Sequence, residues 1–219
     1  MKANTNIKLA RTLFFSSIII LLFTPLYMYF SHDVGRLIGE YPHRLPGTHE
    51  IHYSITKGKP RGWVNLNEIS SSAKWAIILS EDWAFYQHEG IDIEQIKVAF
   101  NEMFTTSRFR GASTITQQMV KNVYLSGYWT MWRKIHEIIL AQKVEKVLRK
   151  GRILEVYLNC IEFGPGIYGI REASLHYFKK SPSALTPKEG AFLAMLLPSP
   201  KRYYQSFKKK KLTPFARSR

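Results

Sequence analysis

The feature that most constrains the fold is an uncharged run of 18 residues near the N-terminus, "LFFSSIIILLFTPLYMYF", at positions 13–30. A run of about this length is the minimum for a helix that crosses a bilayer. Lys2, Lys8 and Arg11 precede it, and positive charge normally stays on the cytoplasmic side of a membrane. The run predicts a single transmembrane helix, with residues 1–12 in the cytoplasm and the rest of the chain outside it.

Two other interpretations of this run were weighed on the same residues. A cleaved signal peptide needs small residues at an A-x-A-like site, and "TPLYMYFSH" offers none. A helix buried in a soluble protein normally shows a polar face, whereas this run has only Ser and Thr to make one. The sequence therefore favours an anchor that is not cleaved.

Charge and cysteine content narrow the possible partners. Lys and Arg outnumber Asp and Glu by 32 to 16, and such a surplus attracts nucleic acid, anionic lipid head groups or a phosphorylated substrate. A position outside the cytoplasm argues against nucleic acid. The single cysteine, Cys160, excludes an internal disulfide and a cysteine-rich metal site.

The rest of the chain is expected to be mainly α. Residues 31–63 mix charge, Gly and Pro and resemble a connector with room for a short strand or two. Residues 64–204 are expected to form one domain, in which the pattern turns helical from about residue 71, without a Rossmann or P-loop glycine pattern. Helices are expected over 92–104, with Asp92 as N-cap, over 108–125 after a flexible start, over 131–151 with Gly151 at the end, and over most of 152–164, 169–180 and 186–197.

Residues 205–219 form a basic tail, "QSFKKKKLTPFARSR". One interpretation is a solvated, partly disordered tail. The other is attraction to an anionic membrane surface, at roughly 1 kcal/mol for each basic residue near the lipid.

The strongest chemical candidate is Glu81 in "SEDWAFYQHEGID" (80–92). An apolar run ends on this carboxylate, and Trp83 and Phe85 lie beside it. Partial removal from water disfavours the charged form of a carboxylate and suits it to general acid or base catalysis. Taken alone, an exposed helix end explains the same residues.

Two further segments add to this. "RGASTITQQMVKN" (110–122) has a glycine, hydroxyls and amides at a predicted helix start, followed by Lys121, which suits phosphate but also describes a capped helix. In "WRKIHE" (132–137), Arg133 and Glu137 share a helix face beside Lys134. They form either an exposed ion pair or a cationic site with a second acid.

These segments, followed by "ILEVYLN" and "GIYGIREASLHYF", resemble in order the motifs of glycosyltransferase family 51, the peptidoglycan glycosyltransferases or murein polymerases. The resemblance covers residues 64–200. It implies a lysozyme-like helical domain, preceded here by the single transmembrane helix. "EFGPGIYG" and the lack of room for a transpeptidase domain after residue 200 indicate the monofunctional biosynthetic branch. Lys179 departs from the pattern, because a Gly commonly follows the "YF" pair.

The resemblance implies two catalytic carboxylates, Glu81 as the base and Glu137 as the second essential acid. It assigns substrate binding to a larger set drawn from the first three motifs: Asp82, Phe85, His88, Arg110, Gly111, Ser113, Thr114, Gln117, Gln118, Lys121, Asn122, Arg133 and Lys134. Glu137 could hold these cations in place or contact a divalent cation such as Mg²⁺ or Mn²⁺, and the sequence does not choose between the two.

The implied reaction joins lipid II to a glycan held on a polyprenyl pyrophosphate, at the outer face of the bacterial cytoplasmic (inner) membrane. Expected partners are lipid II, the growing glycan, the bilayer and other proteins of cell-wall synthesis or division. The rival hypotheses are a lysozyme-like hydrolase or lytic transglycosylase and a non-catalytic wall-binding scaffold. A set of apolar residues could be either core or in contact with the membrane: Phe100, Met103, Phe104, Phe109 and Trp129.

Overall fold

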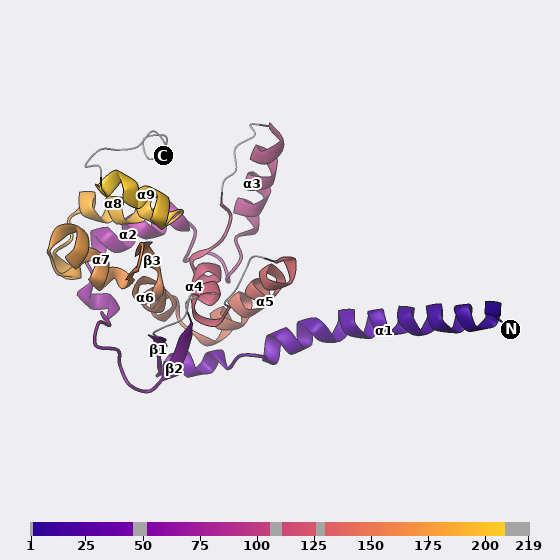
Figure 1. Ribbon diagram of the computed structural model, residues 1–219. Coiled ribbons are helices and arrows are strands. Elements are labelled where there is room, and N and C mark those ends of the chain that lie inside the picture. The colour runs from indigo at the N-terminus through magenta and orange to yellow at the C-terminus, as the bar shows by residue number, and fades with distance from the viewer. Residues whose placement is uncertain (1, 46–51, 106–110, 126–129, 209–219) are drawn as a thin grey trace.

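The structure is a computed structural model that describes residues 2–45, 52–105, 111–125 and 130–208, without the side chains of 2–10, 18–22 and 103–104. The described part is mainly helical, as expected (Figure 1). Its α-helices are α1 (Lys2–Phe30), α2 (Ser71–Glu81), α3 (Ile93–Thr105), α4 (Ile115–Tyr124), α5 (Met131–Val147), α6 (Lys150–Cys160), α7 (Gly169–Phe178), α8 (Pro187–Leu196) and α9 (Pro200–Lys208).

Two short antiparallel hairpins accompany the helices. Strands β1 (Tyr41–Arg44) and β2 (Tyr53–Thr56) pair within the predicted connector, where short strands were expected. Strands β3 (Glu162–Gly164) and β4 (Ile167–Tyr168) were not expected. They lie at the end of the helix predicted over 152–164, which instead stops at Cys160 because the chain turns into a hairpin whose tip, Gly166, has a positive φ of 78°.

The long helix predicted over 131–151 is confirmed as far as Val147 and is wrong in its last four residues, 148–151. Helix α5 ends at Val147, and Leu148 adopts an extended conformation with its side chain buried in the core. Gly151, expected at the end of this helix, instead lies in the first turn of α6. Burial of Leu148 provides a tertiary reason to break the helix that the local pattern does not contain.

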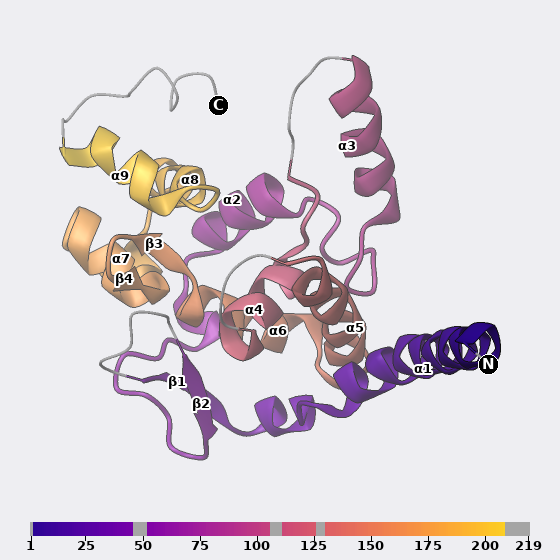
Figure 2. The ribbon, with the colours of Figure 1, turned by 45° about the vertical axis from the view of Figure 1, so that its right-hand side comes forward.

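The core lies where α4 and α6 pack together, with α5 on one side and the pair α2 and α8 on the other (Figures 1 and 2). Helices α2 and α8 approach closely. A Cβ at Gly190 of α8 would lie 2.7 Å from the Cα of Ala73 on α2, so glycine is required there. This contact holds α2 against the core, and the C-terminal end of α2 carries Glu81.

Helix α1 extends away from the other helices, and only its C-terminal end reaches α5 (Figure 1). There Lys143 of α5 donates hydrogen bonds to the carbonyl oxygens of Tyr29 and His32, each at 2.7 Å. His136 contacts the carbonyl of Met28 at 3.1 Å. These side chains satisfy carbonyl groups that the end of a helix leaves without a partner.

No helix in the described part of the chain has both the length and the apolar character needed to cross a membrane. The side chains of residues 18–22, at the centre of the predicted span over 13–30, lie outside the described residues. The transmembrane helix therefore stays a prediction.

Helix α3 stands apart from the rest of the fold (Figure 2). Asp92 caps its start as predicted, accepting a hydrogen bond from the backbone N–H of Gln95 at 2.8 Å. Ile93, Ile96 and Phe100, which share one face by their spacing, are 62%, 42% and 59% exposed. This apolar face is not part of the core. Met103, Phe104, Phe109 and Trp129 lie outside the described side chains.

Two features lie near the C-terminus. Lys179 ends α7 in the left-handed conformation, with φ 58° and ψ 31°, which explains why a glycine is usual at this place. Helix α9 continues to Lys208, into the segment expected to be a tail, and buries Tyr203 and Ser206. Residues 209–219 of the predicted tail lie outside the described residues.

Candidate active site

Glu81 is the last residue of α2, and the following residue, Asp82, connects this helix to α4. The buried Asp82 carboxylate accepts a hydrogen bond from the backbone N–H of Ile115 at 2.9 Å, in the first turn of α4. Its other oxygen accepts one from His88 Nε2 at 2.8 Å. Asp82 therefore sets the position of Glu81 relative to α4 from inside the protein.

His88 has a defined proton arrangement. The backbone N–H of Gly90 donates to His88 Nδ1 at 3.2 Å, so Nδ1 is an acceptor. The proton is therefore on Nε2, which donates the hydrogen bond to Asp82. The predicted substrate-binding residues Asp82 and His88 thus act on each other and on the backbone. Asp82 also lines the pocket described below.

The N-terminus of α4 is capped by protein groups, as the capped-helix interpretation of residues 110–122 predicts. Thr114 and Gln117 form a reciprocal capping box, with bonds of 3.2 Å and 3.0 Å between side chain and backbone. Thr114 Oγ1 also donates to the carbonyl of Gly90 at 2.8 Å, and Ile115 N–H is held by Asp82. The hydroxyl and amide that resembled a ligand-binding signature are therefore used to cap the helix.

Gln118 faces the opposite way and contacts Glu81 directly. Its Nε2 donates to Glu81 Oε2 at 3.1 Å, and its Oε1 accepts from the hydroxyl of Tyr157 at 3.1 Å. Tyr157 belongs to the "ILEVYLN" segment, the first of the two motifs that follow "WRKIHE" in the resemblance. The sequence contains no signal for this contact, because α2, α4 and α6 meet only in the folded protein.

The predicted cations gather near both acids. Lys121 is mostly buried on α4, and removal from water lowers its pKa, while nearby Glu137 and Glu81 act in the opposite direction. Arg133 and Lys134 add to the lowering of this pKa, which places all five charges within electrostatic range of one another. The described structure therefore brings the residues of all three motifs together.

Lys134 joins the second and third motifs. Its ammonium group forms a short ion pair with Glu137 and donates to Ser113 Oγ at 3.0 Å. The Glu137 side chain is buried, so its charge requires this partner. Arg133 lies at the start of α5, where its backbone N–H is capped by Thr130.

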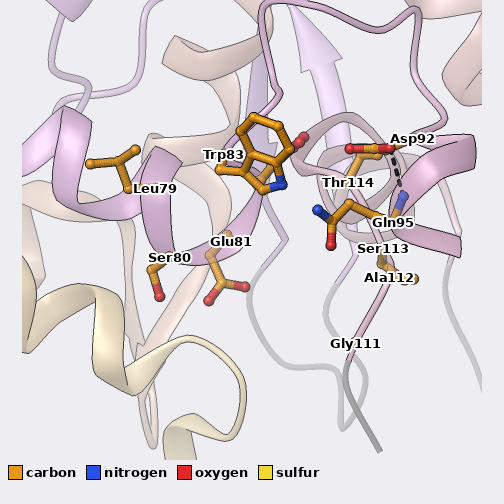
Figure 3. Close-up of a pocket in the computed structure, with 11 residues that line it drawn as sticks. Leu79, Ser80, Glu81, Trp83, Asp92, Gln95, Gly111, Ala112, Ser113 and Thr114 are labelled. Atoms are coloured by element: carbon orange, nitrogen blue, oxygen red, sulfur yellow. Dashed lines mark hydrogen bonds between the residues drawn. The ribbon is translucent and has the colours of Figure 1, made fainter. Parts of the chain in front are cut away.

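A pocket opens between the end of α2 and the segment before α4 (Figure 3). In the close-up, Glu81 lies on one wall, with Gln95 and Ser113 on the opposite side and Trp83 above. The lining consists of Leu79, Ser80, Glu81, Asp82, Trp83, Asp92, Gln95, Gly111, Ala112, Ser113 and Thr114. Ser113 connects this pocket to Lys134 and Glu137, which do not line it themselves.

Several predicted substrate-binding residues do not face this pocket. Phe85 is fully buried in the core, with the ammonium group of Lys150 lying 4.5 Å from the centre of its ring, so its side chain does not reach this pocket. Gln117 is buried in the capping box. Asn122 is partly buried on α4, and Arg110 lies outside the described residues. The pocket is also lined by Trp83, Asp92 and Gln95, which no sequence motif indicated as site residues.

Among the described residues, the side chains that could hold a metal ion are engaged in hydrogen bonds or an ion pair with protein groups. Among the described residues, Asp82, His88 and Asp92 form the one group of three ligand-type side chains whose atoms lie within 4.8 Å of one another. His88 Nε2 carries a proton and Asp82 already accepts two hydrogen bonds, so this group is used as a hydrogen-bond network. Glu137, the predicted metal contact, is ion-paired with Lys134.

Comparison with known proteins identifies the family of the chain. Residues 48–217 match the family model described as Transglycosylase. Proteins called biosynthetic peptidoglycan transglycosylase are 45% identical over 157 residues in Shewanella frigidimarina (72% of this chain, 68% of that protein) and 49% over 139 residues in Shewanella denitrificans (64% and 61%). One from Nitrosomonas eutropha is 42% identical over 142 residues (64% and 58%).

The chain thus spans between 58% and 68% of the length of these three relatives. The matched region contains the residues that line the pocket and the nearby charged residues Lys121, Arg133, Lys134 and Glu137. The chain belongs to the transglycosylase family.

Proposed function

We propose that this protein is a peptidoglycan glycosyltransferase that polymerises lipid II into glycan strands. The observation that carries the proposal is the position of Glu81. Its carboxylate lines a pocket whose opposite wall, at Ser113, is hydrogen-bonded to Lys134. An acid on one side and cations behind the other match a reaction that removes a proton and releases a phosphate leaving group.

The proposed chemistry begins at the 4-hydroxyl of the acceptor sugar. Glu81 takes the proton of this hydroxyl, and the oxygen forms a bond to the anomeric carbon of the donor sugar. The bond from that carbon to the pyrophosphate oxygen breaks, and its electron pair leaves with the polyprenyl pyrophosphate. Attack from the face opposite the leaving group inverts the anomeric configuration.

Negative charge grows on the pyrophosphate as this bond breaks. Lys121, Arg133 and Lys134 supply positive charge within electrostatic range of one another, and the position of Lys134 is set before the reaction by its bonds to Ser113 and Glu137. Glu137 holds Lys134 through the ion pair. In this scheme Glu137 acts by positioning a cation, and no step passes through a metal ion.

Both sugars carry lipid tails, so the site must stay close to a bilayer. The uncharged run at 13–30 supplies the proposed anchor, and it places the catalytic domain outside the cytoplasmic membrane. The exposed apolar face of α3, with Ile93, Ile96 and Phe100, is the proposed second contact with the membrane.

The test is incubation of the purified full chain with lipid II, followed by separation of glycan products by length. The proposal predicts polymer from the wild type and a loss of about 10²–10³-fold in rate in Lys121→Ala and Arg133→Ala. A hydrolase would instead cleave preformed glycan and leave lipid II unpolymerised. A scaffold would do neither, and its cellular function would survive Glu81→Gln.

A further inference from the structure

Three residues from three helices form a continuous chain of hydrogen bonds that ends on Glu81. The hydroxyl of Tyr157 on α6 donates to Gln118 Oε1 on α4 at 3.1 Å. Gln118 Nε2 then donates to Glu81 Oε2 at the end of α2, also at 3.1 Å. Tyr157 is 0% exposed, so its hydroxyl cannot reach a substrate or bulk water.

The direction of these hydrogen bonds follows from the groups involved. An ionised carboxylate only accepts, so the amide nitrogen of Gln118 must face Glu81. The amide oxygen then faces Tyr157, which must donate. Burial, together with the nearby charges of Glu81 and Asp82, raises the pKa of Tyr157 well above its ordinary value. The phenol therefore keeps its proton and remains a donor.

We propose that Tyr157 is a positioning residue for the catalytic base, acting on Glu81 through the side-chain amide of Gln118. This inference rests on the proposed function, in which Glu81 accepts the proton of the acceptor hydroxyl. The tyrosine hydroxyl holds the amide in the orientation that presents N–H to the carboxylate. The amide in turn fixes the Glu81 side chain and favours its charged form.

Loss of the Tyr157 hydroxyl has a defined chemical consequence. The amide of Gln118 loses the donor that fixes its orientation and is free to rotate, so Glu81 loses a hydrogen bond that stabilises its ionised form. Protonation of Glu81 then becomes easier. As the pH is lowered, the rate of polymerisation should begin to fall at a higher pH than in the wild type, because a protonated base cannot accept the proton of the acceptor hydroxyl.

The test is the pH–rate profile of Tyr157→Phe on lipid II, which removes one oxygen and keeps the buried ring. We expect the acid limb to move upward by about one pH unit, with kcat lowered about 3–10-fold at neutral pH and KM changed less than about twofold. Tyr177→Phe is the matched control. Tyr177 is also a buried tyrosine, but its hydroxyl donates to the carbonyl of Phe163 at 2.8 Å. Its profile should match the wild type.

A second variant shows whether Tyr157 acts through Gln118. Gln118→Met keeps a similar volume and removes both hydrogen bonds, so it should move the acid limb as Tyr157→Phe does. In the Gln118→Met background, Tyr157→Phe should add no further shift. Should Tyr157→Phe not fold, Gln118→Met alone decides the point, and an acid limb at the wild-type position overturns the inference.

The outcomes separate this inference from the proposed function. A wild-type protein and Tyr177→Phe control that make no polymer from lipid II overturn the proposed function itself. An active wild type whose acid limb is unchanged in Tyr157→Phe overturns the positioning role alone. So does a shift that is fully additive with that of Gln118→Met.

Discussion

Glu137 and Lys134 form a short ion pair across one turn of α5, and the carboxylate is buried while the ammonium group reaches Ser113 at the pocket. The second acid of the site therefore holds a cation in place. This relationship joins the third motif to the pocket wall.

Removal of the Lys134 ammonium group should destabilise the fold more than removal of an exposed lysine. Lys134→Met leaves the buried Glu137 charge without its close partner, and we expect the free energy of unfolding to fall by about 1–3 kcal/mol. Lys97→Met is the matched control, because Lys97 pairs with Glu94 at the same i,i+3 spacing but both side chains are exposed. That change should stay within about 0.5 kcal/mol in urea unfolding. Equal effects from the two variants would count against a buried pair.

Lys121 should set the alkaline limit of activity. Burial lowers its pKa, so its positive charge is lost at a lower pH than that of an ordinary lysine. If the charge stabilises the leaving group, the rate falls as the pH rises through that pKa. Lys121→Arg should move the alkaline limb upward, because arginine stays charged. Initial rates on lipid II across alkaline pH test this, with Lys180→Arg as the control at a partly exposed lysine that pairs with Glu189. The same alkaline limb in Lys121→Arg and the wild type would show that Lys121 does not set it.

The junction between α1 and α5 should weaken in mild acid. Ser31 Oγ contacts ring nitrogens of both His32 and His136, at 2.8 Å and 2.9 Å. Burial lowers the pKa of each ring, and the charges of His136 and Lys143 add to the effect on His32. For a histidine with a lowered folded-state pKa, the unfolded chain binds more protons, so stability is full above about pH 6.5 and is lost as the pH falls toward the folded-state pKa.

Melting temperature between about pH 7.5 and pH 5.5 measures this effect. His136→Asn should reduce the fall in melting temperature over this pH range, whereas His43→Asn, on the β1–β2 hairpin, should leave that fall unchanged. A slope that is identical in the wild type and His136→Asn would exclude this junction as its source.

Lys179 should be replaceable by glycine with a gain in stability. The residue occupies the left-handed region, which costs a residue with a Cβ roughly 1–2 kcal/mol. Glycine avoids this cost, but it makes the unfolded chain more flexible, and this offsets part of the stabilisation. We expect Lys179→Gly to raise the free energy of unfolding by about 0.5–1 kcal/mol. Lys179→Ala keeps the strain and removes the same long side chain, so it is the control. A glycine variant no more stable than the alanine variant would refute the explanation.

Much of the fold could be predicted because its signals are local. The cap at Asp92 and the start of α8 at Pro187 each depend on residues only a few positions apart in the sequence. The break at Leu148 and the β3–β4 hairpin could not be predicted in this way, because tertiary packing decides them. Local periodicity carries no information on contacts between distant segments.

The candidate site shows the same division. Motif resemblance selected Glu81, Gln118, Lys121 and Lys134, which the structure brings close together. It did not distinguish side chains that face the pocket from those that build it, such as Thr114 in the capping box. The contact of Tyr157 with Gln118 was missed because it joins residues 39 positions apart.

The role of Glu81 as the catalytic base is tested most directly by measuring lipid II binding and the rate of glycan extension separately in Glu81→Gln. This substitution keeps the size of the side chain but removes a group able to take a proton. Binding of lipid II to the purified variant should stay within about threefold of the wild type, while the single-turnover rate of glycan extension should fall by at least about 10²-fold. A Glu81→Gln variant that binds lipid II and extends glycan at the wild-type rate would contradict the claim that Glu81 is the catalytic base.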